Sequence, residues 1–193
     1  AGTTDGEELV FVMGQTGQTP FLLGLSYPNA RDVAESVDEL AGLAVYTFQQ
    51  VSVTTPDGAA ERGYGHAVSG DYFDVLGVDM HLGRGFTMEE GRPDSPAPVV
   101  VLDYRYWESR MGADPAVVGT GLELNGVPFT IVGVAPEAYL GAEQMLGTNL
   151  YLPLGGLVAL DAANSDWIQS RGASIFRAIG RLADGVRLEA TKV

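Results

Sequence analysis

The sequence predicts an α+β fold in which short helices alternate with strands that pair through tight hairpins. Glycine supplies 26 of the 193 residues. That share is well above the usual ~7%, and no collagen-like period accompanies it, so the glycines mark turns. Hydrophobic residues make up 46% of the chain, enough for a packed core. Two pairs of β-rich runs flank turn sequences, TPDG at 55–58 and Asn125-Gly126.

The first strand and the first hairpin are predicted from short apolar and β-rich runs. Leu9 to Met13 is an apolar run typical of a strand, and a loop-forming GQTGQTP sequence follows at 14–20. Residues 43–54 and 61–68 are β-rich and flank the TPDG turn. This arrangement predicts an antiparallel hairpin.

A helix is predicted over residues 26–42. Ser26 can cap its start, and Pro28 lies in the first turn, where a missing N–H costs nothing. Gly42 is placed to end it. One apolar stripe recurs at helical spacing. Its members are Ala30, Val33, Ala34, Val37, Leu40 and Ala41.

A second, shorter helix is predicted over residues 69–77. Ser69 is a good N-cap, Asp71 and Asp74 suit the positive helix start, and Gly77 suits the C-terminal end. Three large apolar side chains can then face the core. They are Tyr72, Phe73 and Leu76.

The second half begins after a polar, Gly/Pro-rich connector at 83–98, which is the best candidate for a subdomain boundary. Residues 99–102 form a continuous apolar run typical of a buried strand. Asp103 is placed to cap a helix that runs to about Met111 and ends at Gly112.

The remaining elements are mostly strands. Asn-Gly at 125–126 predicts a type I′ hairpin, because both turn positions need positive φ. The predicted segments are a turn at 113–119, strands at 121–125, 127–134, 150–154 and 176–182, a short helix with a loop at 155–172, a turn at 184–186, and the start of a helix at 187–193.

Composition excludes several classes of function. The chain has 11 basic and 25 acidic residues, a net charge of −14, which repels nucleic-acid phosphates and anionic lipids. Without cysteine there is no disulfide, zinc-thiolate site or thiol nucleophile. No apolar run reaches the ~18–20 residues that span a bilayer. The first residues form no signal peptide and no initiator Met is present, so we expect a fragment of a longer protein.

Candidate catalytic residues are sparse. Ser69 does not lie in a G-x-S-x-G elbow, because Ala67 and Asp71 stand where glycines are required. A triad of Ser69, His66 and Asp71 can be drawn, but closeness in sequence says nothing about triad geometry. A cap at the start of the following helix is the favoured interpretation of Ser69.

Metal and ligand sites have equally weak signals. His66 and His81 lie in no HxxxH or HExxH pattern, so a metal pair is poorly supported. The acidic residues of the connector do not match an EF-hand, and we expect a solvated acidic loop. They are Glu89, Glu90 and Asp94. Trp107 is interpreted as a core or inter-lobe anchor, whereas Trp167 lies in a less patterned region and can be more exposed. No catalytic, cofactor-binding or metal-binding residue is assigned.

Nine segments in register resemble one known family. They are EELV (7–10), SYPNARDV (26–33), VSGDYFDVLGV (68–78), GRGFT (83–87), PVVVLDYRYW (98–107), DPAVVG (114–119), LNGVPFTIVGVAP (124–136), LYLPL (150–154) and IGRLADGVRLEA (179–190). Together they resemble the extracytoplasmic core domain of MacB-like (FtsX-superfamily) ABC transporter permeases, in particular the large acidobacterial-type permeases. The resemblance covers nearly the whole chain.

The resemblance implies two lobes and no cofactor. A porter-like α/β lobe would comprise residues 1–85 and 171–193, and a β-rich (Sabre-like) lobe, residues 86–170, would be inserted between them. The family domain lies between two transmembrane helices at the periplasmic face of the bacterial inner membrane. It transmits movement driven by a cytoplasmic ATPase, and a periplasmic adaptor, a cargo or a second copy are the partners it implies. Because the family pattern has no catalytic residues, none is carried over, and at 188–193 the first lobe is expected to be incomplete.

Three functions therefore follow from the sequence. The first is a non-catalytic, periplasm-facing permease domain for efflux or export. The second is a free-standing ligand-binding module, which needs an apolar cleft between lobes. The third is a hydrolase that uses Asp/Glu or a Ser–His pair, which needs a deep pocket around His66 or carboxylates.

Overall fold

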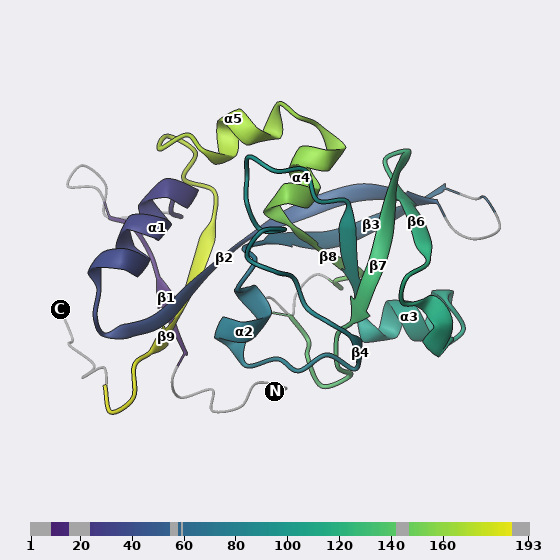
Figure 1. Ribbon diagram of the computed structural model, residues 1–193, viewed down its shortest axis with the longest axis horizontal. Coiled ribbons are helices and arrows are strands. Elements are labelled where there is room, and N and C mark those ends of the chain that lie inside the picture. The colour runs from purple at the N-terminus through teal and green to yellow at the C-terminus, as the bar shows by residue number, and fades with distance from the viewer. Residues whose placement is uncertain (1–8, 16–23, 55–57, 59, 142–146, 187–193) are drawn as a thin grey trace.

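The structure, a computed structural model, describes residues 9–15, 24–54, 58, 60–141 and 147–186 (Figure 1). Within these ranges the strands form one sheet of nine strands, in the order β1-β9-β2-β3-β8-β5-β7-β4, while β6 pairs with β2 and β7. Most neighbouring strands are antiparallel, but β3 pairs with β8, and β5 with β7, in parallel. This mixed sheet with short helices confirms the α+β class.

The elements follow the predicted order closely. The strands are β1 (Leu9–Val12), β2 (Leu40–Thr54), β3 (Ala60–Val68), β4 (Leu82–Gly83), β5 (Val99–Leu102), β6 (Gly121–Leu124), β7 (Val127–Val134), β8 (Leu150–Pro153) and β9 (Arg177–Leu182). The helices are α1 (Tyr27–Ser36), α2 (Tyr72–Leu76), α3 (Tyr104–Arg110), a 3-10 turn (Pro115–Val117), α4 (Leu154–Leu160) and α5 (Asn164–Ile168).

Strand β2 is the longest element, at fifteen residues, and crosses the molecule from α1 to β6 (Figure 1). Its first half pairs with β9, from Leu40↔Leu182 to Tyr46↔Arg177. From Tyr46 onward its other edge pairs with β3. Its last residues, Val53 and Thr54, also pair with β6. One strand therefore pairs with β9 near its start and with β6 at its end.

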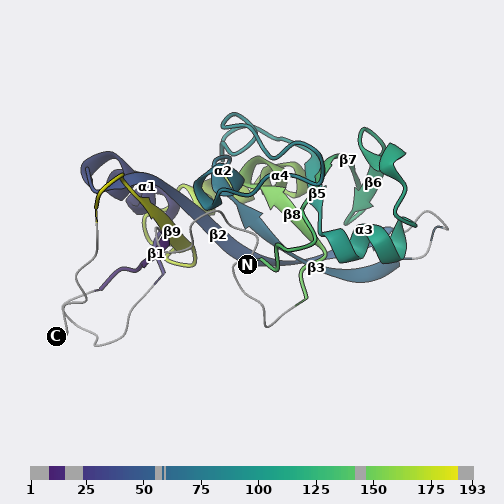
Figure 2. The same ribbon diagram turned by 90° about the horizontal axis from the view of Figure 1, so that it is seen from below.

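The sheet buries side chains on both faces. Successive residues of a strand point to opposite faces, and Val45 and Tyr46 accordingly join different core clusters. The same alternation separates Val100 and Leu102 from Val101. Helices α1, α3, α4 and α5 contribute to the first cluster and α2 to the second. In the view of Figure 2, both α2 and α4 lie above the ribbon of β2 and β3.

The first helix ends earlier than the sequence predicts. Ser26 caps it as expected, since its Oγ accepts a hydrogen bond from the Asn29 N–H at 3.3 Å. The helix stops at Ser36, however, and the prediction that Gly42 ends it is wrong. Residues 40–42 instead begin β2, because pairing with β9 satisfies their backbone groups.

The predicted role of Ser69 as a helix cap is also wrong. Helix α2 starts at Tyr72, and Asp71 occupies its N-cap without a side-chain hydrogen bond. The Ser69 Oγ accepts instead from the Val45 N–H at 3.0 Å, which ties the end of β3 to β2. Gly77 ends the helix in the left-handed conformation, with φ 64°, as predicted. The three predicted core residues of this helix are buried.

Two other local predictions are confirmed. Asn125 and Gly126 have φ of 51° and 79°, so the β6–β7 hairpin uses the predicted turn. Asp103 caps α3, because its Oδ1 accepts from the N–H groups of Arg105 and Tyr106. The β2–β3 hairpin is also present, although residues 55–57 of its turn lie outside the described residues, as do 16–20 and the predicted helix start at 187–193.

Residues 84–98 contain no helix or strand, as expected of a connector. The connector packs against its neighbours at two glycines. A Cβ on Gly91 would lie 2.2 Å from the Gly70 nitrogen, and one on Gly155 would lie 2.4 Å from the Ser95 carbonyl oxygen. The missed strand β4 pairs with β7 just before it. The division into lobes 1–85 with 171–193 and 86–170 stays a prediction.

Candidate functional site

The residues considered for catalysis serve structural roles. His66 is 2% exposed on β3, and its ring lies among those of Tyr46 and Tyr151 at centroid distances of 5.6 and 6.2 Å. Ser69 is bonded to the β2 backbone. The cavity that Ser69 and Asp71 share holds about 20 Å³, room for about one water. The surroundings of Ser69 and Asp71 therefore give no space for a substrate.

The acidic residues of the connector are paired with arginines. Arg84 bonds to both carboxylate oxygens of Glu90 at 2.8 and 2.9 Å, and Arg92 contacts Glu89 and Asp94. Burial alone raises the pKa of Glu90, but the bonds from Arg84 and Thr87 outweigh it and hold that pKa below its usual value. Each of these three carboxylates therefore has an arginine partner within the connector.

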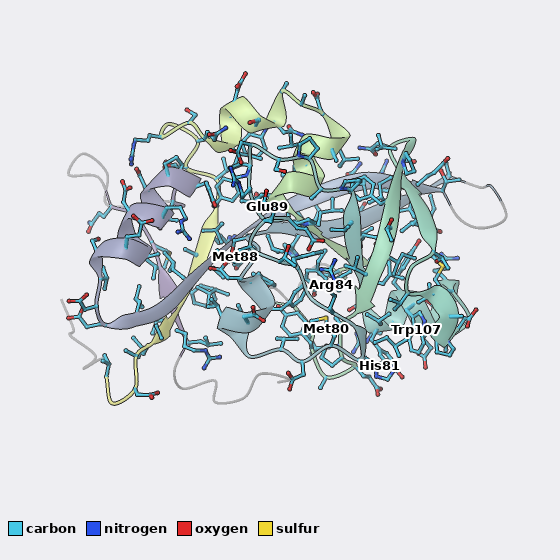
Figure 3. All side chains as sticks on the ribbon, in the orientation of Figure 1. Met80, His81, Arg84, Met88, Glu89 and Trp107 are labelled. Carbon is cyan, nitrogen blue, oxygen red and sulfur yellow. The ribbon has the colours of Figure 1, made fainter. Side chains whose placement is uncertain are left out.

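Thr87 and Glu90 also form a reciprocal pair. The Thr87 N–H donates to Glu90 Oε2 at 2.8 Å, and the Glu90 N–H donates to Thr87 Oγ1 at 3.2 Å. This is the geometry of a capping box, and it fixes the turn that contacts Gly70. Figure 3 shows Arg84, Met88 and Glu89 along this connector.

His81 belongs to an aromatic cluster at the other end of the connector, beside Trp107 (Figure 3). Its ring centroid lies 5.0 Å from that of Tyr104 and 5.2 Å from that of Trp107. Trp107 is 5% exposed and donates to the Asp114 carbonyl, which confirms it as a core anchor. Trp167 is half-buried and stacks on Phe176. Across the described ranges, no group of three His, Asp or Glu side chains is placed to hold a metal.

The arrangement of β1 and β9 is the most informative feature for function. They pair antiparallel from Leu9↔Arg181 to Val12↔Ala178. The first described residue of β1 therefore lies beside the last residues of β9. The start of β1 and the end of β9 therefore lie at the same place in the sheet.

The side chain of Asn125 forms a hydrogen bond with the far end of β2. The Ser52 N–H donates to Asn125 Oδ1 at 2.7 Å, and the Asn125 N–H donates to the Ser52 carbonyl at 2.8 Å. Because β9 pairs with the first half of β2, the sheet gives a continuous path from β1 to the β6–β7 hairpin. Sequence reasoning missed this path, since the strand order depends on contacts far apart in the chain.

Comparison with known proteins agrees with this architecture. Residues 2–192 match the family described as MacB-like periplasmic core domain. A curated relative is the macrolide export ATP-binding/permease protein MacB of Shigella dysenteriae serotype 1 (strain Sd197), 35% identical over 92 residues. That alignment covers 46% of this chain and only 13% of the relative. No helix among the described residues is long and apolar enough to cross a membrane.

Solved structures show the same fold at low sequence identity. The periplasmic region of MacB from Actinobacillus actinomycetemcomitans aligns with a TM-score of 0.67 at 16% identity, covering 94% of this chain and 77% of that one. A permease domain from Porphyromonas gingivalis gives 0.64 at 17% identity over 93% and 75%. The extracellular domain of the transporter YknZ from Gram-positive bacteria gives 0.61 at 13% over 92% and 83%. The chain belongs to the MacB-like periplasmic core domain family, and it is the periplasmic domain of an ABC transporter permease of the inner membrane.

Proposed function

We propose that the domain transmits ATPase-driven movement of the permease to its distal surface, where it contacts a periplasmic adaptor or a cargo for export. The pairing of β1 with β9 carries this proposal. In the full-length permease these strands would continue toward two transmembrane helices, so a shift of either helix would turn the sheet as a unit. The cytoplasmic ATPase would supply the energy, and a homodimer would place two such domains side by side.

The length of β2 sets the scale of the movement. Fifteen residues at about 3.3 Å each give a strand of about 50 Å. A tilt of about 10° at the β1–β9 end then moves the β6–β7 hairpin by about 9 Å, if the sheet stays rigid. A displacement of this size is enough to open or close a contact with a partner.

The domain is proposed to be non-catalytic. Ser69 bonds to the backbone, and the cavity it lines admits about one water. A ligand-binding module would need an apolar cleft, but the groove of about 470 Å³ between β3 and α3 is lined mainly by charged and polar side chains. The net charge of −14 argues against a nucleic-acid partner.

Two proline variants of the edge strand test this proposal. The backbone N–H and C=O of Val45 bond to Ser69 and so point away from β9. Backbone groups alternate in direction along a strand, so those of Ala44 point toward β9, where Ala44 pairs with Ile179. The backbone groups of Ile179 therefore point to β2, and those of its neighbours Ala178 and Gly180 point to β1. Val10 is opposite Gly180, so its N–H points at β9, whereas the N–H of Phe11 points away. Val10→Pro removes a bond between β1 and β9, and Phe11→Pro is its matched control.

The assay uses the full-length permease with its ATPase in proteoliposomes. The proposal predicts that Val10→Pro keeps ATP hydrolysis but loses most coupled export, whereas Phe11→Pro retains both. Equal export by the two variants would show that the β1–β9 pairing does not transmit movement.

A further inference from the structure

Two arginines that line one groove at the distal end of the sheet form no ion pair within 4.0 Å among the described residues. Five other arginines each form an ion pair with a carboxylate; they are Arg31, Arg84, Arg92, Arg110 and Arg171. The side chains of Arg62 and Arg105 are exposed and make no hydrogen bond or ion pair in the described part of the chain. In a chain with 25 acidic and 11 basic residues, two exposed arginines without an ion pair in one groove are unexpected.

The groove lies between β3, the start of α3 and residues 147–149, and holds about 470 Å³. This size falls in the range of ligand-binding pockets. Both of its carboxylates are already engaged. Glu61 accepts from the Tyr106 hydroxyl at 3.0 Å and pairs with Arg110 at 3.2 Å. Asp103 caps α3. The charge of Arg105 also acts on Asp103 and opposes the rise of its pKa on burial. With three arginines against two carboxylates, the groove carries a net positive charge.

One wall of the groove is an open strand edge. The Tyr64 N–H donates to Asn149 Oδ1, and its carbonyl accepts from the Asn149 N–H, so both face away from β2. Because these groups alternate along a strand, the backbone N–H and C=O of Arg62 face the same way. Among the described residues, β3 has no partner strand on that side before Gly65. An extended peptide can pair with such an edge.

An aromatic pair lies on the face of β2 and β3 that carries Arg62. Phe48 is 41% exposed and stacks on Tyr64 at a centroid distance of 5.9 Å. Tyr64 lies two residues from Arg62 on β3 and so shares its face. Aromatic residues and arginine are both enriched at protein–protein interfaces.

We propose that this groove binds an extended acidic segment of a partner protein, which pairs with the outer edge of β3 while Arg62 and Arg105 hold its carboxylates. The planar guanidinium group matches a carboxylate in two parallel hydrogen bonds. At physiological ionic strength the charge of −14 is screened beyond about 8 Å, so the nearby arginines dominate recognition. This inference names the partner chemistry of the proposed function and rests on it.

Peptide binding to this chain tests the inference without any transport measurement. The probe is a dye-labelled oligoglutamate peptide, followed by fluorescence anisotropy. Its controls are the oligoglutamine analogue, an oligoglutamate N-methylated at alternate residues, which cannot pair fully with a strand edge, and inorganic phosphate as competitor. The variants are Arg62→Gln and Arg105→Gln, with Arg31→Gln removing the same charge from α1.

The inference predicts saturable binding of oligoglutamate only. Each groove variant weakens it about fivefold, the double variant weakens it further, and Arg31→Gln changes it less than twofold. Circular dichroism confirms that each variant is folded. The N-methylated peptide binds about fivefold more weakly than its parent.

Several results would overturn the inference. They are absence of binding, equal binding by the groove variants, an equal loss in Arg31→Gln, unaltered binding of the N-methylated peptide, and full displacement by millimolar phosphate. Self-association of the chain that the double variant abolishes, without peptide binding, would assign the groove to a second copy and would also overturn it. None of these results touches the β1–β9 coupling, which the proline variants test separately.

Discussion

Replacing Gly91 with alanine tests how the connector is held on the domain. The new Cβ would lie 2.2 Å from the nitrogen and 2.5 Å from the Cα of Gly70. Ordinary contacts begin near 3.4 Å, so one backbone segment must move by about 1 Å. Neither atom belongs to a flexible side chain. The strain therefore reaches the end of β3 and the start of α2.

The expected net cost is about 1–2 kcal/mol. Overpacking of a tight site costs about 1–3 kcal/mol. Against this, a Gly-to-Ala change at a compatible backbone stabilises by about 0.4–1 kcal/mol through the unfolded chain. For a chain of this length, 2 kcal/mol lowers Tm by about 4–8 °C.

Urea unfolding followed by circular dichroism measures the difference in the free energy of unfolding. Gly172→Ala is the matched control, because a Cβ there meets only the Ser170 Oγ at 3.6 Å. We expect this control to be neutral or slightly stabilising. A Gly91→Ala value within about 0.5 kcal/mol of the control would show that the connector does not pack on Gly70 as described.

Three further predictions concern single side chains. Asn125→Ala loses the side-chain bond to Ser52 and places alanine at φ 51°, so we expect it to lower the free energy of unfolding in urea by about 2 kcal/mol. Asn125→Gly loses only the bond and should cost about 1 kcal/mol, so equal costs would contradict the backbone strain. The pKa of Glu90 is lowered on folding, so its contribution is present above the unfolded pKa near 4.5 and is lost as pH falls through the folded pKa. Glu90→Gln should therefore flatten the fall in the free energy of unfolding between about pH 6 and 3, and an unchanged slope would exclude this pairing. Tyr139→Phe removes the 2.8 Å bond between the buried hydroxyls of Tyr139 and Tyr72 and should cost about 1 kcal/mol by thermal unfolding, whereas no loss would show that the bond contributes little.

Local features were predictable from the sequence because local chemistry determines them. Asn125-Gly126 needs two residues that tolerate positive φ, and the structure has them there. Asp103 offers a carboxylate to the free N–H groups of α3. Helix α1 shows the limit of such reasoning. Its apolar stripe continues to Ala41, but pairing of residues 40–42 with β9 takes precedence over the helical pattern.

Features made by distant segments could not be predicted. The parallel pairing of β3 with β8 joins residues 85 positions apart, as the Tyr64–Asn149 bond shows. The Ser69 Oγ accepts a hydrogen bond from the Val45 N–H of β2 and not from an N–H of its own helix, because the end of the hairpin places that N–H beside it. The arginine groove combines β3 with α3 and residues 147–149, and no sequence motif marks it.

A disulfide between β1 and β9 tests the central claim most directly. Phe11 and Ile179 are opposite each other, and they form a non-hydrogen-bonded pair, where side chains come closest. These 193 residues contain no cysteine, so Phe11→Cys with Ile179→Cys introduces the only cysteine pair of this domain. If the two strands move together, export by the full-length permease is the same in the oxidised and reduced variant. Export that stops on oxidation and returns on reduction would show that the strands must separate, which contradicts transmission through the paired ends.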